Sequence, residues 1–424
     1  MISRAAVVGA ALAVAAAAPA AAGEPDATAP AYAVALRGSD GGFAWRGRET
    51  LTLTNPGPRA LDRVWIRLWG NGRGGCRGRR AVRIGAVHGA RPGRLRLRCT
   101  AVALRLAAPL APGARGSVSF RLAIRVPRAD DRFGHGGRHL ALLSNAIPAL
   151  AHRERGRWRL DRWFGSGEAW TYPAADWTVR LDAPPQVSVA APGVRLPDGS
   201  RRVEHGRDYS FAAGHMRALR ADVGGVAVSV WAAQRARPAR LARALAIARK
   251  RLARLTALYG PYGWPDLQIV LTDVTAMEHT GLVMTPAVDL VITHELAHQW
   301  WFGSVGDDQA RSPWLDEAFA SFAEEAAGDE PPWCFRPGPD ARLVTHGVAY
   351  WRPRDERYGV VYYEGACLLD MLQARMGRER FRAALRDYAI AQRYGWSTGA
   401  RFRAAMDAAS PAPLGDLWRR YRIR

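Results

Sequence analysis

The stretch VITHELAHQWWFG, residues 291–303, contains residue types whose spacing suits metal binding. His294 and His298 are four positions apart, and Glu295 directly follows the first histidine. Residues four apart share one face of a helix, so both imidazoles can direct a nitrogen to one point. Zinc binds histidine nitrogens at roughly 2.0–2.1 Å, and the glutamate beside them can act as a general base. The motif has few fixed positions, however, and also arises by chance at the edge of an ordinary core helix.

A third ligand is needed, because two histidines alone hold zinc poorly. The stretch PWLDEAFASFAEE places Glu317 nineteen residues after His298, on a second helix expected to open after Pro313. An ionised carboxylate among such apolar neighbours is costly unless a positive group pairs with it, and zinc would be that group. Asp316, beside Glu317, is a candidate to support a ligand histidine.

These residues resemble those of a known family. HELAHQWWFG, followed at this spacing by WLDEAFA, is similar to the gluzincin zinc metallopeptidases of the aminopeptidase N and leukotriene hydrolase family. The resemblance implies one Zn2+ per chain bound by His294, His298 and Glu317, with Glu295 as the general base that activates water. It also implies peptide substrates, and an all-β domain that precedes a thermolysin-like catalytic domain.

Two further motifs of that family have counterparts here. The segment T-A-M-E-H, residues 275–279, resembles the family's G-x-M-E-N motif, which assigns Met277 and Glu278 to substrate binding, with the glutamate holding the free α-amine. The segment VYYEGACLL places Tyr362 where the family has a tyrosine that stabilises the tetrahedral intermediate. Tyr363 is the neighbouring candidate, and an interfacial aromatic without a catalytic role is the alternative for Tyr362.

The sequence also departs from the family. His279 replaces an asparagine, only sixteen residues separate Glu278 from His294, and about a hundred residues follow Glu317. We expect a zinc aminopeptidase that removes N-terminal residues from peptides, and two alternatives stay open. One is a zinc endopeptidase with relaxed recognition of the N-terminus. The other is a catalytically silent protein of the same fold that binds envelope polyanions.

The arginine content is the basis of the second alternative. The 424-residue chain has 61 basic and 38 acidic residues, a formal net charge of +23, and nine arginines without an acid between Arg73 and Arg98. Such a surface favours contact with an anionic envelope surface, although a solvated strand face with basic loops is the commoner explanation. No nucleic-acid motif accompanies it, so we expect no nucleic-acid partner. The oligomeric state stays open.

The periodicity of the apolar residues predicts the elements that position these motifs. From about residue 32 to residue 230 apolar residues recur at every second position, which is typical of β-strands. Beyond residue 235 the period is helical, with a helix expected between Pro238 and Gly260 and a buried strand at residues 267–271.

The chain is too long for one ordinary core, so more than one domain is expected. Together with the family resemblance, the change of period predicts a multidomain α and β protein. Residues 23–208 would form an N-terminal all-β antiparallel sandwich or saddle, and residues 209–424 a thermolysin-like α+β catalytic domain.

The N-terminal residues predict a signal peptide, residues 1–22. An early arginine, an alanine-rich apolar stretch and small residues near position 22 follow the pattern of a secretory leader. A single-span anchor is the alternative, but the apolar run is shorter than the roughly 20 residues that cross a bilayer. We therefore expect a secreted or periplasmic protein.

The four cysteines fit such an oxidising compartment. Cys76 and Cys99 are the pair that we expect to form a disulfide. Cys334 and Cys367 could form a second pair in the catalytic domain, or Cys367 could be a plain buried thiol on a helix.

Overall fold

The computed structural model describes residues 29–137, 139–165, 168–328, 334 and 336–424. The expected signal peptide lies outside these residues. None of the described helices combines the length and the apolar character that a membrane crossing requires.

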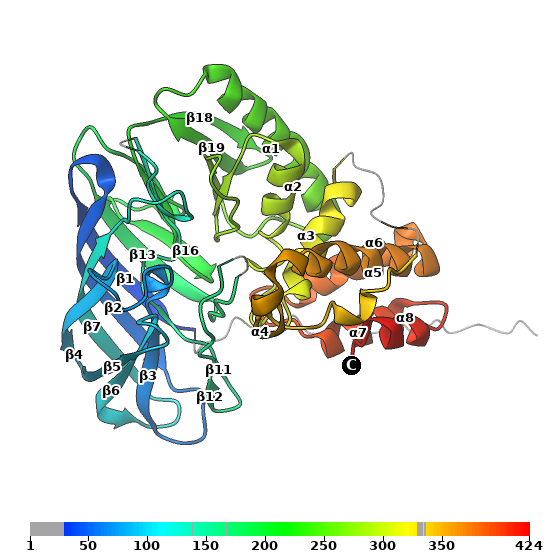
Figure 1. Cartoon of the computed structure of the whole chain (residues 1–424), viewed down its shortest axis with the longest axis horizontal. Coiled ribbons are helices and arrows are strands. Elements are labelled where there is room, and N and C mark those ends of the chain that lie inside the picture. The colour runs from blue at the N-terminus through cyan, green and yellow to red at the C-terminus, as the bar shows by residue number, and fades with distance from the viewer. Residues whose placement is uncertain (1–28, 138, 166–167, 329–333, 335) are drawn as a thin grey trace, which may run out of the picture.

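The first part of the described chain consists of strands, which Figure 1 shows gathered on one side of the molecule. The largest sheet has the order β15 (Val194–Arg195), β16 (Arg201–Gly206), β13 (Ala175–Asp182), β1 (Ala31–Gly38), β2 (Ala44–Thr54), β7 (Arg115–Arg125) and β4 (Val82–His88). A second sheet has the order β10 (Ala149–Leu150), β3 (Leu61–Arg67), β6 (Ala101–Leu110) and β5 (Ala90–Arg96). A short hairpin joins β11 (Arg153–Glu154) to β12 (Arg157–Trp158).

The alternating pattern of β7 explains how one face of the largest sheet is buried. Val118, Phe120, Leu122 and Ile124 are almost fully buried, whereas the residues between them are more exposed. Side chains of a strand point alternately to its two faces, so this alternation lines the core with one face.

One strand pair departs from the expected antiparallel arrangement. Strands β1 and β13 run parallel, with Ala31 opposite Asp176 and Arg37 opposite Asp182. Parallel neighbours need a long connection, and residues 39–174 provide it.

The sheet pairing changes between Gly214 and Met216. A third sheet has the order β14 (Ser188–Ala190), β17 (Phe211–Gly214), β9 (Leu140–Leu143) and β8 (Phe133–Gly134), so β17 still pairs with an earlier strand. The next strand opens a mixed sheet with the order β18 (Met216–Val223), β19 (Val226–Ala233), β20 (Asp266–Leu271) and β21 (Leu282–Thr285). The domain division expected at residue 209 stays a prediction.

Helices make up most of the remaining chain, and Figure 1 shows α3 to α8 on the side away from the large sheet. They are α1 (Pro238–Tyr259), α2 (Asp289–Ala297), α3 (Trp314–Ala326), α4 (Val348–Trp351), α5 (Val360–Met376), α6 (Arg378–Ala391), α7 (Gly399–Ala409) and α8 (Gly415–Tyr421). The 3-10 turns are η1 (Asp40–Gly42), η2 (Trp69–Asn71), η3 (Ala341–Leu343) and η4 (Arg352–Arg357).

The helix expected between Pro238 and Gly260 is α1. Pro238 suits its first turn because that position needs no N–H donor, and Gly260 ends the helix with φ 95°, a conformation that favours glycine. Helix α1 packs against α2, and α2 packs against α3, so the two segments with the metal-binding motifs lie side by side in the core.

Both disulfides are formed. Cys76 pairs with Cys99, as predicted, and Cys367 of α5 pairs with Cys334 rather than remaining a buried thiol.

Candidate metal and catalytic centre

Three side chains converge as the metal-binding motif predicts. Nε2 of His294 and Nε2 of His298 lie 3.1 Å apart, and Oε2 of Glu317 lies 3.3 Å from the first and 3.4 Å from the second. Within the described parts of the chain, they are the one group of histidine, cysteine or acidic side chains arranged to hold a metal ion.

Helices α2 and α3 supply these ligands. His294 lies within α2, and His298 follows its last residue with helical φ and ψ of −62° and −14°, so both imidazoles remain on one helical face. Glu317 lies in the first turn of α3, which begins after Pro313 as expected.

The second nitrogen of each imidazole also has a partner. Nδ1 of His294 lies 2.7 Å from Oε1 of Glu324, and Nδ1 of His298 lies 3.0 Å from the backbone oxygen of Trp301. Partners of this kind orient the ring and leave Nε2 available to a metal ion.

Glu324, and not Asp316, provides the carboxylate behind a ligand histidine. Asp316 instead accepts hydrogen bonds from the side-chain amide of Gln309 and from the backbone N–H of Glu317. The reason is helical geometry: a residue adjacent to Glu317 points about 100° away from it, whereas a residue seven positions later returns to nearly the same face.

Charge compensation holds Glu317 ionised. Burial acts to raise its pKa, but hydrogen bonds with His294 and His298 outweigh burial and hold the pKa well below its usual range. Burial acts to lower the pKa of His298, and the contact with Glu317 reverses this and raises it to about 10. The carboxylate and the imidazoles therefore stabilise each other's charged forms.

The donor set fits zinc. Ligand atoms that lie roughly 2.0–2.1 Å from a tetrahedral ion are about 3.3–3.4 Å from one another. The three separations in the structure, 3.1, 3.3 and 3.4 Å, match this spacing. Two histidines and one glutamate also leave the fourth position open, as in catalytic zinc sites.

Glu295 is buried beside these ligands. Its Oε2 has no hydrogen-bond partner among the described residues. Burial raises the pKa of Glu295 to about 7, although the nearby His294 and His298 oppose the increase. A carboxylate with such a pKa can both accept and return a proton near neutral pH.

Tyr362 reaches the same group of residues from α5. Its hydroxyl donates a hydrogen bond of 2.7 Å to Oε1 of Glu317, and its ring stacks on His294 at 5.8 Å between centroids. Burial and the charge of Glu317 raise its pKa well above the ordinary value, so the hydroxyl keeps its proton. Tyr363 is 55% exposed, so Tyr362 is the tyrosine of this pair that lies at the centre.

A glycine lets α5 approach α3 closely at this point. A Cβ atom on Gly365 would lie 2.5 Å from Cβ of Ala318, which is shorter than any contact that two such atoms tolerate. Ala318 adjoins Glu317, and Gly365 is three residues after Tyr362, so this close approach sets the distance between the hydroxyl and the carboxylate.

The T-A-M-E-H segment forms an outer edge of the mixed sheet. Met277 exchanges two backbone hydrogen bonds with Met284 of β21, at 2.8 and 2.9 Å, and both residues are buried. His279 is fully buried and its Nδ1 faces Oδ2 of Asp208. The residue that replaces the family's asparagine therefore has a partner of its own other than Glu278.

Glu278, like Glu168, is a further acid buried near the metal ligands. Its Oε1 lacks a hydrogen-bond partner among the described residues, and burial together with the charge of Glu168 raises its pKa well above the ordinary value. Burial also raises the pKa of Glu168, against the effect of Arg132, which donates a hydrogen bond to it. A cation placed between the two carboxylates would relieve this unfavourable arrangement.

Two of these residues, Glu324 and Glu168, were not predicted from the sequence. Glu324 had a detectable signal, because it lies seven positions after Glu317 on a predicted helix and so on nearly the same face. Glu168 had none, because it lies more than a hundred residues before the motif and only the fold brings it to Glu278.

Sequence comparison finds relatives among aminopeptidases, while no protein-family model matches the chain. The chain is 29% identical over 269 residues to an aminopeptidase N of Lactobacillus delbrueckii subsp. lactis. The matched region covers 51% of this chain and 32% of that protein. It is 29% identical over 233 residues to an aminopeptidase N of Lactobacillus helveticus, covering 46% and 28%. The chain thus spans about a third of the length of these curated relatives.

Solved structures share the fold over nearly the whole chain. An M1 zinc metallopeptidase from Deinococcus radiodurans matches with a TM-score of 0.62 and 19% identity, covering 93% of both chains. A mutant M1 zinc metallopeptidase from the same organism, bound to a Tyr-Ser-Ala substrate, matches with a TM-score of 0.62 and 19% identity, covering 93% and 94%.

The curated relatives share sequence with this chain, and the solved structures share its fold. The resemblance expected from the motifs is therefore confirmed: in sequence and in fold, the chain is similar to the gluzincin zinc metallopeptidases of the aminopeptidase N family.

Proposed function

We propose that the protein is a zinc aminopeptidase that hydrolyses the N-terminal residue from peptides. The observation that carries the proposal is the placement of a buried acid pair, Glu278 and Glu168, beside a zinc-type ligand set. The ligand set supports peptide hydrolysis, and the acid pair supports recognition of a free N-terminus.

His294, His298 and Glu317 would hold one zinc ion per chain. Zinc bound there would supply Lewis acidity, which lowers the pKa of water toward neutrality and polarises a peptide carbonyl group.

Glu295 acts as the general base. Its carboxylate accepts a proton from the attacking water and then transfers that proton to the leaving amine. Tyr362 donates a hydrogen bond to the carbonyl oxygen as negative charge develops on it, and its raised pKa keeps the hydroxyl protonated for this role.

Glu278 and Glu168 bind the α-ammonium group of the substrate, and the buried Met277 holds the segment that carries Glu278 against β21. An ammonium compensates two buried carboxylates that otherwise repel each other. A substrate without that charge leaves the acids unpaired, which lowers its rate of cleavage and gives the enzyme its specificity for free N-termini.

We also propose the remaining features expected from the sequence. The chain would comprise an all-β antiparallel sandwich or saddle, residues 23–208, and a thermolysin-like catalytic domain, residues 209–424. The leader, residues 1–22, would direct the protein to the periplasm or the exterior, and the two disulfides support an oxidising location.

Metal analysis combined with hydrolysis of a panel of aminoacyl-anilides tests the proposal. We expect about one zinc per chain and cleavage of at least one anilide. Glu295→Gln keeps the ligands but removes the base, so zinc should be retained while turnover falls by about 10²–10⁴-fold. Full activity of the metal-free protein, or no cleavage of any anilide by the zinc-loaded protein, would overturn the proposal.

A further inference from the structure

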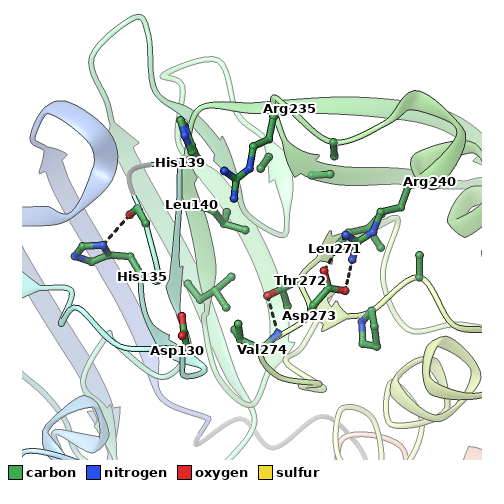
Figure 2. Close-up of a pocket in the computed structure, with 18 of the residues that line it drawn as sticks. Asp130, His135, His139, Leu140, Arg235, Arg240, Leu271, Thr272, Asp273 and Val274 are labelled. Carbon is green, nitrogen blue, oxygen red and sulfur yellow. Dashed lines mark hydrogen bonds and ion pairs between the residues drawn. The ribbon is translucent and has the colours of Figure 1, made fainter.

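The lining of a cavity of about 920 Å³ includes residues a few positions before Glu278 and His294, and the proposed mechanism does not use this cavity. Residues from four parts of the chain line it: 129–137 with 139–142, 232–243, 271–274 and 286–288. Figure 2 shows that these segments come from both the strand-rich part of the chain and the part that carries α1 and α2.

Two walls of the cavity lead directly to the centre. Val274 precedes Glu278 by four residues, so their Cα atoms lie at most about 13 Å apart. Val288 precedes His294 by six residues, which is about 9 Å along a helix. A few residues of extended peptide therefore connect the ammonium site to the cavity.

The T-A-M-E-H segment, residues 275–279, sets the direction of a bound peptide. Met277 turns its N–H and C=O toward Met284, so the backbone of Ala276 points to the opposite, outer side, where a peptide can pair. The carbonyl of Glu278 instead accepts a hydrogen bond from the side chain of Gln299. The residues after Glu278 are fully buried, whereas Val274 before it is 45% exposed. A peptide whose ammonium lies at Glu278 can therefore extend only toward Val274 and into the cavity.

Cations without partners line this cavity. Arg235, Arg237 and Arg243 are exposed and have no ion pair within the described part of the chain, and Figure 2 shows Arg235 pointing among the lining residues. Arg240, in contrast, is paired with Asp273.

Of the three acids that line the cavity, Asp273 is paired with Arg240, so two remain to oppose these cations. Asp131 is paired with Arg73, so Asp130 is the lining carboxylate without an ion pair among the described residues. The three unpaired arginines therefore outnumber it. Val274 and Val288, both among the exposed large apolar side chains of the chain, lie on the same lining.

We propose that this cavity binds the part of the peptide that follows the cleaved bond and selects substrates that carry a carboxylate there. The carboxylate is an acidic side chain or the C-terminus of a short peptide. This inference rests on the proposed function, because it assigns the downstream half of the same substrate.

Three peptides test whether the cavity selects an acidic side chain. They share their first two residues and an amidated C-terminus, and their third residue is Glu, Gln or Lys. We expect kcat/KM to be about threefold to tenfold higher for Glu than for Gln, the effect of one or two exposed ion pairs, and lowest for Lys. The difference should shrink as salt increases. Comparing the Gln peptide as its free acid and as its amide tests the C-terminal carboxylate.

The combined variant Arg235→Gln, Arg237→Gln, Arg243→Gln should make the Glu and Lys peptides equally good substrates. Because the result is a ratio within one variant, a general loss of activity does not affect it. Arg249→Gln removes an exposed arginine of α1 that does not line the cavity, and it should leave the ratio unchanged.

The inference and the proposed function fail in different ways. Hydrolysis of anilides without discrimination between Glu and Lys peptides, or a preference that survives the combined variant, overturns the inference alone. If no anilide is cleaved, the proposed function fails. Binding of the Glu and Lys peptides to zinc-loaded Glu295→Gln, measured by calorimetry, then still decides whether the cavity selects carboxylates.

Discussion

Nδ1 of His294 lies 2.7 Å from Oε1 of Glu324, on the side of the imidazole away from the other ligands. The carboxylate orients the ring and stabilises the positive charge that the imidazole gains when it binds a metal ion. This contact makes Glu324 a positioning residue for the metal centre.

Glu324→Gln should therefore weaken zinc binding by about 10–100-fold without removing a ligand. Competition with a chelator measures this affinity. Glu356→Gln removes an exposed carboxylate and serves as the matched control. Equal zinc affinity for the two variants would show that Glu324 does not support the site.

Tyr362→Phe should lower kcat by about 10²–10³-fold, with a smaller effect on KM, because its hydrogen bond to the substrate forms mainly in the transition state. The matched control is Tyr363→Phe, which changes a side chain that is 55% exposed. Steady-state kinetics on one aminoacyl-anilide separates kcat from KM. A damaging Tyr363→Phe beside a silent Tyr362→Phe would reverse the assignment.

Gly365→Ala should separate α5 from α3, because the added Cβ would lie 2.5 Å from Ala318. Overpacking of this kind lowers the free energy of unfolding by about 1–3 kcal/mol, which denaturant titration measures. At Gly359 the nearest atom, on Tyr363, lies 3.4 Å from the new Cβ, so Gly359→Ala should cost less. Similar stability of the two variants would contradict the close approach of α3 and α5.

Glu278→Ala should weaken cleavage of free-amine peptides by about 2–5 kcal/mol, the usual effect of truncating one partner of a buried charge pair. N-acetylated peptides should be poor substrates of the wild type and little affected by the change. Glu356→Ala is the control for loss of an acid. If the wild type cleaves acetylated and free peptides equally well, the protein is an endopeptidase with relaxed N-terminal recognition.

Zinc binding should weaken as the pH falls. Burial lowers the pKa of His298, but its contact with Glu317 raises it to about 10, so the metal-free imidazole carries a proton at neutral pH. Zinc needs the neutral imidazole and must displace that proton, so its affinity should fall by about tenfold per pH unit for each proton released. Calorimetry in buffers with different ionisation enthalpies counts these protons. A pH-independent affinity between pH 6 and pH 8 would contradict this coupling.

The features that depend on local spacing could be predicted from the residues alone. Two histidines four apart on one helix face a common point whatever surrounds them, so His294 and His298 could be paired in advance. The limits of α1 followed from Pro238 and Gly260, because both residues act on the backbone locally. Strand β7 was also predictable, since its alternation reflects only which face is buried.

The contacts between distant segments, in contrast, became apparent only in the folded chain. The charge of Glu168 acts on Glu278 although 110 positions separate them, and neither the sequence around Glu168 nor its residue type distinguishes it from other acids. The choice of Tyr362 over Tyr363 depends on which side of α5 faces α3, and Gly365 sets that approach. The parallel pairing of β1 with β13 likewise joins remote strands. Such contacts form because burial of apolar side chains in the whole core brings the segments together. Which segments become neighbours is not encoded in the periodicity of any one segment.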